Sequence, residues 1–168
     1  MHEVTARVME RLRPLSLTFQ KKPILIGGMA MEYYGMRKAG ADIDLVISNE
    51  DYQALAAKHP GRRKDIYGDL GLLLNEFEIW RSIALMDYDF FLKDAIGEGE
   101  VFVVSIDRLL WMRVCAMEVE KYRKDLCLMK NYYYTHFTNP DYLREARTHD
   151  KSYAKMNGTV VGGRYEDA

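Results

Sequence analysis

The sequence predicts an α+β fold in which a small mixed sheet is flanked by helices and the C-terminal part is helical. Up to residue 104, short apolar runs of strand length alternate with segments whose apolar residues recur at helical spacing. From Ser105 onward the spacing is helical. The chain has 168 residues, 48% of them hydrophobic. A chain of this length can bury about 70% of its unfolded surface in a single core.

The first elements follow from apolar spacing and from glycine and proline. Residues 3–13 are predicted to form an amphipathic helix that stops at Pro14. The apolar run 23–26 predicts a buried strand, and it ends in a tight turn at Gly27-Gly28. Residues 29–37 suit a second helix.

The middle of the chain predicts further strands around one helix. Residues 42–48, with the sequence DIDLVIS, alternate polar and apolar side chains as a half-buried strand does. Asn49 is a candidate N-cap for a helix that runs to Lys58. Residues 62–71 are ambiguous, whereas 72–85 predict a hairpin or two short strands.

The later elements are a short helix, one strand and several helices. A helix is expected near 88–95, followed by a strand at 100–104. Ser105 is a candidate N-cap for the next helix, and another helix is expected at 121–134. Asn139-Pro140 has the pattern of an N-cap followed by proline at the first helical position.

These elements predict a core at 1–104, helices at 105–150 that pack on it in the same domain, and a flexible polar tail at 151–168.

Cys115 and Cys127 form no CxxC motif and suit neither a zinc site nor a disulfide framework. With no apolar stretch near 20 residues, we expect a cytoplasmic protein without a membrane partner. Its aromatic-rich C-terminal helices could support a homodimer.

The charge balance gives no general attraction for nucleic acid, because the net charge is −1. Basic residues are clustered at 37–38, at 62–64 and at 121–124. Such runs are usually solvated surface, and this is how we interpret them at first.

Two aspartates are the first candidates for chemistry. Asp42 and Asp44 are two positions apart on one predicted strand, so both carboxylates point to the same face while Ile43 and Leu45 point into the core. Two carboxylates this close repel each other unless a cation lies between them. Hard oxygen ligands suit Mg²⁺, whose coordination is usually completed by water and substrate phosphates.

The diglycine is the second candidate. A strand that ends in Gly27 and Gly28 and leads directly into a helix leaves free backbone N–H groups at the helix start, where phosphate can bind. Glycine also lets a ligand approach the backbone closely. The next strand brings Asp42 and Asp44, so a phosphate-binding turn and a metal-binding pair are expected at the ends of neighbouring strands.

The stretch GGMAMEYYGMRKAGADIDLVIS resembles the hG[G/S]…DhD core of the minimal nucleotidyltransferase superfamily, which includes the polymerase-beta-like transferases. It is similar, more closely, to AbiEii-type toxins and related nucleotidyltransferase groups. The resemblance spans roughly residues 24–128 and implies a nucleotidyltransferase fold. The segment VFVVSIDRLLWMRV…YRKDL looks like the family's strand, capped helix and basic segment, carried here by Arg113, Arg123, Lys124 and Asp125.

The resemblance also implies a third acid on a later strand. Glu78, in the sequence FEIW, falls in that place, and Glu76 or Asp87 are alternatives. In the family pattern, Asp42, Asp44 and Glu78 would hold Mg²⁺ and support catalysis, with Gly27, Gly28, Arg123 and Lys124 contacting the phosphates or the acceptor.

The function that follows is Mg²⁺-dependent transfer of a nucleoside monophosphate from an NTP to an acceptor hydroxyl on RNA, such as tRNA, or on protein. The protein could then be a toxin–antitoxin component with an antitoxin partner. Glu78 stands where Asp is commoner, and 39–41 lack the usual Thr. These departures keep open a non-catalytic protein that binds a nucleotide or a partner. A small-molecule (antibiotic) nucleotidyltransferase is the third alternative.

Overall fold

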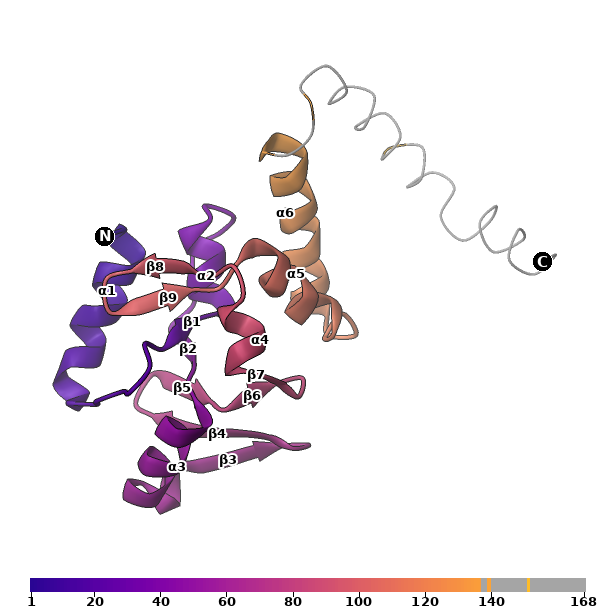
Figure 1. Ribbon diagram of the computed structural model, residues 1–168. Helices are drawn as coiled ribbons and strands as arrows, with labels where there is room; N and C mark the ends of the chain where they lie inside the picture. The colour runs from indigo at the N-terminus through magenta and orange to yellow at the C-terminus, as the bar shows by residue number, and fades with distance from the viewer. Residues whose placement is uncertain (137–138, 140–150, 152–168) are drawn as a thin grey trace. The chain divides into compact units, whose positions relative to one another are not determined.

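The computed structural model describes residues 1–136, 139 and 151 (Figure 1). The fold and the site described below lie within one compact unit, residues 1–126. No helix among the described residues combines the length and apolar character needed to cross a bilayer. The helix start expected at Asn139-Pro140 and the tail expected at 151–168 lie, apart from Asn139 and Lys151, outside the described residues.

Across the described residues, one mixed sheet of seven strands organises the fold (Figure 1). The β2–β5 and β1–β9 pairs are parallel and the other neighbours are antiparallel. The class and the mixed character of the sheet are confirmed, and the ambiguous stretch 62–71 contains β3 and the start of β4. In spatial order the strands are β3 (Arg63–Ile66), β4 (Asp69–Leu74), β5 (Phe77–Trp80), β2 (Ile43–Val46), β1 (Ile24–Leu25), β9 (Val101–Val103) and β8 (Ile96–Glu98).

The described helices occur where apolar spacing predicted them. Short 3-10 turns follow α1 and α3, and β6 with β7 forms a separate hairpin. The helices are α1 (Glu3–Leu12), α2 (Gly27–Tyr33), α3 (Asn49–Lys58), α4 (Tyr88–Leu92), α5 (Ile106–Val114) and α6 (Glu120–His136); the turns are η1 (Arg13–Leu15) and η2 (Pro60–Arg62); the hairpin strands are β6 (Ser82–Ile83) and β7 (Met86–Asp87).

Three details of the sequence prediction are wrong. The N-cap of α3 is Ser48, not Asn49, because the Ser48 hydroxyl accepts a hydrogen bond from Asp51 N at 3.1 Å. Helix α2 starts at Gly27, so the glycines form its first turn instead of preceding it. The sequence predicted no strand at 96–98, yet this stretch is the edge strand β8, since its backbone pairs with β9.

The core lies along the inward face of the two central strands. Ile43 and Leu45 of β2 are completely buried, and so are Phe77 and Ile79 of β5. Because side chains alternate along a strand, the residues between them face the other side of the sheet. The core therefore fixes which face of β2 and β5 carries polar groups.

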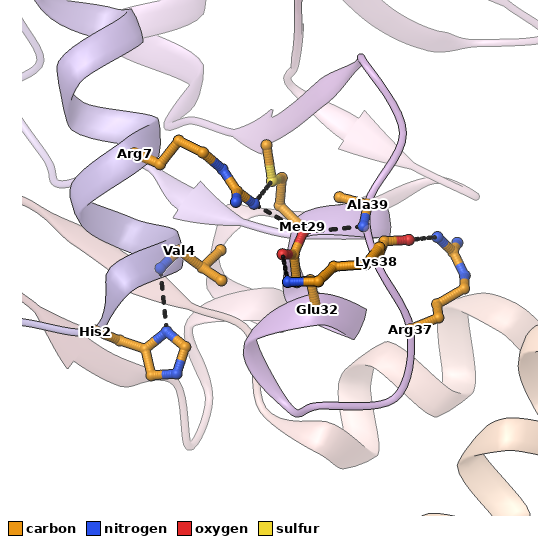
Figure 2. A network of polar contacts seen from close by, with 8 residues as sticks. All are labelled: His2, Val4, Arg7, Met29, Glu32, Arg37, Lys38 and Ala39. Atoms are coloured by element: carbon orange, nitrogen blue, oxygen red, sulfur yellow. Dashed lines mark hydrogen bonds and ion pairs between the residues drawn. The ribbon is translucent and has the colours of Figure 1, made fainter.

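A polar network around Glu32 joins α1, α2 and the loop before β2 (Figure 2). Arg7 of α1 lies 2.7 Å from one carboxylate oxygen of Glu32, and Lys38 lies 3.0 Å from the other. The backbone N–H of Ala39 also donates to Glu32 at 2.9 Å. Burial alone would raise the pKa of Glu32, but the hydrogen bonds from Ala39, Arg7 and Lys38 outweigh it and lower the pKa to about 2.

Glu32→Gln should lower the melting temperature at neutral pH by a few degrees. The folded-state pKa of Glu32 is depressed, so its stabilising contribution is present above the ordinary glutamate pKa of 4.5 and is lost as the pH falls toward about 2. Thermal denaturation of wild type and variant across this range should show the difference shrinking on acidification. Glu10→Gln, at an exposed position of α1, is the control. A difference that grows toward low pH would contradict the network's role.

A candidate active site on strands β2 and β5

Asp44 and Glu78 are direct neighbours on two parallel strands. In the β2–β5 pairing, Asp44 is opposite Glu78, while Ile43 pairs with Phe77 and Leu45 with Ile79. The apolar pairs are buried in the core, so the two acids share the opposite face. The structure therefore brings these two carboxyl groups to one place on the sheet.

Gly27 lies directly against Asp44. Ile26 N donates to the backbone oxygen of Asp44 at 3.1 Å, which joins the end of β1 to β2. Gly27 has φ +64°, and a Cβ built there would overlap the carboxylate of Asp44. Glycine is thus required both by the left-handed backbone and by the space that the Asp44 carboxylate occupies.

A cavity of about 390 Å³ opens at this point. Its charged and polar side chains come from β2, β3, β4, β5, α5 and α6, and most of its apolar side chains come from β3, the β6–β7 hairpin and α5. A larger cavity of about 640 Å³ shares none of these residues. The lining residues are Ile26, Gly27, Asp44, Lys64, Ile66, Asp69, Glu78, Trp80, Ile83, Ala84, Met112, Arg113, Ala116 and Tyr122.

Burial and a like charge make ionised Asp44 unfavourable. Burial is the main cause that raises the pKa of Asp44, and the charge of Glu78 raises it further. The Trp80 side chain and the charge of Arg113 act in the opposite direction without cancelling the increase in the Asp44 pKa. Glu78 has its own cation, since Lys64 Nζ lies 3.2 Å from its carboxylate.

A buried ion-pair cluster supports the guanidinium of Arg113 beside the cavity. Arg113, only 5% exposed, lies with its Nε 3.0 Å from Asp125 Oδ2 and its guanidinium over the ring of Tyr122. Burial lowers the pKa of Arg113, while Asp125 opposes that shift. Arg37 binds the same carboxylate through Nε at 2.6 Å and Nη2 at 3.0 Å, and these hydrogen bonds raise the Arg37 pKa. Asp125 therefore links Arg37, in the loop after α2, to Arg113, which lines the cavity.

Four of the residues predicted for the site are not part of the cavity lining. Asp42 is exposed just before β2 and acts on Asp44 only through its charge. Gly28 is half-buried and faces Arg37 and the backbone of the following loop. Arg123 and Lys124 are exposed on α6, where Lys124 pairs with Glu120. The described structure brings together Gly27, Asp44 and Glu78 only.

The alternative third acids lie elsewhere. Glu76 is in the turn between β4 and β5, where its backbone oxygen accepts a hydrogen bond from Ile43 N. Asp87 caps α4 by accepting a hydrogen bond from Phe90 N. Neither lines the cavity that contains Asp44.

Sequence reasoning overlooked Lys64, Trp80 and Tyr122, which line this cavity. Lys64 belongs to the basic run 62–64 that was interpreted as solvated surface. Neighbouring residues of a strand face opposite sides, so Lys64 would have been separated from exposed Arg63 had the strand been predicted. The stretch 62–71 was ambiguous, however. Tyr122 belongs to α6, and no local sequence pattern indicates that this residue lines the cavity.

The donor set suits a hard cation only in part. Within residues 1–136, 139 and 151, no three His, Cys, Asp or Glu side chains are gathered as a metal site. Asp44 and Glu78 supply two adjacent carboxylates, the donor chemistry that Mg²⁺ prefers. Mg²⁺ usually keeps several waters and takes further ligands from substrate phosphates, so two carboxylates fit a site that the substrate completes.

No known family model and no curated protein sequence matches this chain.

Asp44→Asn should raise the melting temperature in the presence of a chelator at neutral and alkaline pH. Because the folded-state pKa of Asp44 is raised, its contribution to stability is greatest below the ordinary aspartate pKa of 3.8 and is lost as the pH rises through the folded pKa. The stabilisation by Asn should therefore grow as the pH rises above about 4. Asp89→Asn, at an exposed position, should show no such trend. An Asn variant less stable at every pH would contradict this electrostatic account.

Gly27→Ala and Gly28→Ala form a matched pair. Alanine at Gly27 needs a left-handed backbone and overlaps Asp44, so we expect a loss of roughly 1–3 kcal/mol in unfolding free energy. Alanine at Gly28 makes ordinary contacts of 3.6 Å or more and should change stability by less than about 1 kcal/mol. Urea denaturation measures both. Equal losses would mean that Gly27 has no special contact with the acid.

Proposed function

We propose that the protein is a Mg²⁺-dependent nucleotidyltransferase that moves a nucleoside monophosphate from an NTP to an acceptor hydroxyl. The observation that carries the proposal is the in-register pair of Asp44 and Glu78 beside Gly27 in one cavity. The resemblance of 27–48 to the nucleotidyltransferase core supports the same reaction and the same fold.

Asp44 and Glu78 would hold Mg²⁺, with Asp42 contributing negative charge from the edge of the site. The bound ion would neutralise negative charge on the triphosphate. The acceptor oxygen forms a bond to the α-phosphorus, the bond to the β-phosphate oxygen breaks, and pyrophosphate leaves. Glu78 would accept the proton of the acceptor hydroxyl.

Cations in the cavity would bind the triphosphate. Arg113 is held in place by Asp125 and presents a fixed positive charge. Lys64 can leave Glu78 when the divalent cation arrives and pair with a phosphate. The family resemblance implies that the backbone at Gly27 and Gly28 would contact a phosphate group. Exposed Arg123 and Lys124 are candidates for contacts to the acceptor outside the cavity.

The acceptor and the cellular role complete the proposal. RNA, including tRNA, and protein are the acceptor classes that the family resemblance suggests, and an antitoxin partner or a homodimer fits the toxin–antitoxin interpretation. Cys115 and Cys127 are free and exposed, as a cytoplasmic location would allow. A small-molecule acceptor ranks below these.

A second candidate function is nucleotide or partner binding without catalysis. The specific observation that favours it is the pairing of Glu78 with Lys64, which occupies the proposed base. Calorimetry with NTP and Mg²⁺ separates the two functions. Tight binding without turnover favours this candidate over the enzyme.

Asp44→Asn and Glu78→Gln should each reduce nucleotidyl transfer by about a hundredfold or more, since each removes a group that stabilises charge or accepts the proton. The assay uses NTPs labelled at the α-phosphate, Mg²⁺, and total RNA or cell protein. Glu76→Gln, two positions before Glu78 but outside the cavity, should retain activity. Absence of transfer by the wild-type protein, or full transfer by both site variants, would refute the enzymatic proposal.

A further inference from the structure

Two hairpins end in tight turns whose backbone conformation does not suit their residues. Ile66 pairs with Asp69 across Tyr67-Gly68, and Ile83 pairs with Met86 across Ala84-Leu85, so each loop has two residues. All four loop residues have positive φ: 51° and 99° in the first turn, 50° and 60° in the second. This is the φ pattern of a type I′ turn, where Asn-Gly or Gly-Gly is favoured.

The residues found there are unusual for such turns. The other described non-glycine residues with positive φ are Ser16, Asn75 and Asp94, which have short polar side chains. Asn and Asp in particular visit the left-handed region routinely, whereas Tyr, Ala and Leu do so at a conformational cost. The apolar exceptions are thus confined to these two turns within the described chain.

Their side chains gain little burial in return. Tyr67 is 99% exposed and Leu85 is 72% exposed, while neighbouring Ile66 is 42% exposed. An exposed apolar side chain in a strained backbone conformation stabilises neither the fold nor the turn. A binding role accounts for both features.

The two turns form one surface. A Cβ built on Gly68 would lie 3.2 Å from Cδ2 of Leu85, so the two turns are in contact. Asp69 fixes the second turn to β4 by accepting hydrogen bonds from Ala84 N at 2.6 Å, Leu85 N at 2.8 Å and the Ser82 hydroxyl at 2.9 Å. In Figure 1 the β3–β4 and β6–β7 hairpins end on the same side of the molecule.

This surface, defined by Ile66, Tyr67, Ala84 and Leu85 and called the tip platform below, continues into the candidate active site. Ile66 and Ala84 line the cavity that contains Asp44 and Glu78. In the β4–β5 pairing, Leu73 is opposite Glu78. Asp69, where β4 begins beside the Tyr67-Gly68 loop, is four residues from Leu73, about 13 Å away at the usual strand rise. A segment of a few nucleotides covers this length.

Cations lie along the same path. Lys64 lines the cavity and contacts Glu78, and Arg62 is exposed at the end of η2, just before β3. A free aromatic ring followed by cations matches the two parts of single-stranded nucleic-acid binding, a base-stacking surface and phosphate contacts.

We propose that the tip platform binds the end of a single-stranded RNA by stacking a base on Tyr67 and Leu85, which directs the terminal hydroxyl toward Asp44 and Glu78. This inference rests on the proposed function in one respect: it identifies the terminal hydroxyl of the RNA as the acceptor of the transfer reaction. The binding itself does not depend on catalysis.

The test measures RNA binding and protein stability on the same variants of the full chain. A short fluorescein-labelled single-stranded RNA is titrated with wild type, Tyr67→Asn, Leu85→Asn and Tyr67→Phe, using fluorescence anisotropy. Trp111→Ala is the control, since Trp111 is 52% exposed on α5 and outside the tip platform. Melting temperatures are determined without RNA.

Each Asn substitution should both weaken RNA binding and raise the melting temperature of the protein. Asn relieves the left-handed strain and removes the stacking surface, so we expect about tenfold or greater loss of affinity with a more stable protein. Tyr67→Phe keeps the ring and should bind as wild type does, as should Trp111→Ala. A merely structural role for Tyr67 cannot produce this opposite movement of stability and binding.

Three outcomes would overturn the proposal: no RNA binding by the wild type, unchanged affinity in both Asn variants, or equal competition by inorganic polyphosphate, which lacks bases. The Asp44→Asn variant separates the proposed nucleotidyl transfer from RNA binding by the tip platform. It should lose the transfer activity and still bind RNA. Ring-dependent RNA binding without any transfer refutes only the enzymatic proposal. Transfer to a protein with no RNA binding refutes only the tip platform.

Discussion

The parallel pairing of β2 with β5 is the constraint on which the rest of the site depends. Burial of Ile43, Leu45, Phe77 and Ile79 fixes this pairing, because a shift of one residue would turn the whole apolar set away from the core. The same register leaves two carboxyl groups side by side on the opposite face. The hydrophobic core thus sets the spacing of the polar site, although none of its residues takes part in any chemistry.

The surroundings of the acid pair reduce its electrostatic cost without removing it. Lys64 compensates Glu78 and Arg113 acts on Asp44, but the pKa of Asp44 stays raised. Arg113 in turn depends on Asp125, whose buried carboxylate also binds Arg37. A divalent cation between the carboxylates would relieve the repulsion that the protein leaves in place. The electrostatic arrangement therefore favours a ligand-dependent site over a purely structural one.

The sequence predicted those parts of the structure that depend on local pattern. The alternation in DIDLVIS identified β2 and the core positions Ile43 and Leu45, and Ser105 was recognised as the cap of α5. Asp42 was misplaced because alternation cannot show that the strand begins one residue later. The contacts of Lys64 with Glu78 depend on pairing between distant strands, which no local pattern encodes.

Two separate costs meet at one cavity. Replacing Asp44 by its amide would remove the unfavourable charge beside Glu78. Asn or Gly at Tyr67 and at 84–85 would remove the backbone strain of the left-handed turns. Single substitutions would therefore stabilise the fold, yet Asp44 and Ala84 line the same cavity. Local violations of folding preference are expected where binding or chemistry requires them. We propose on this basis that the acid pair and the tip platform are parts of one functional surface.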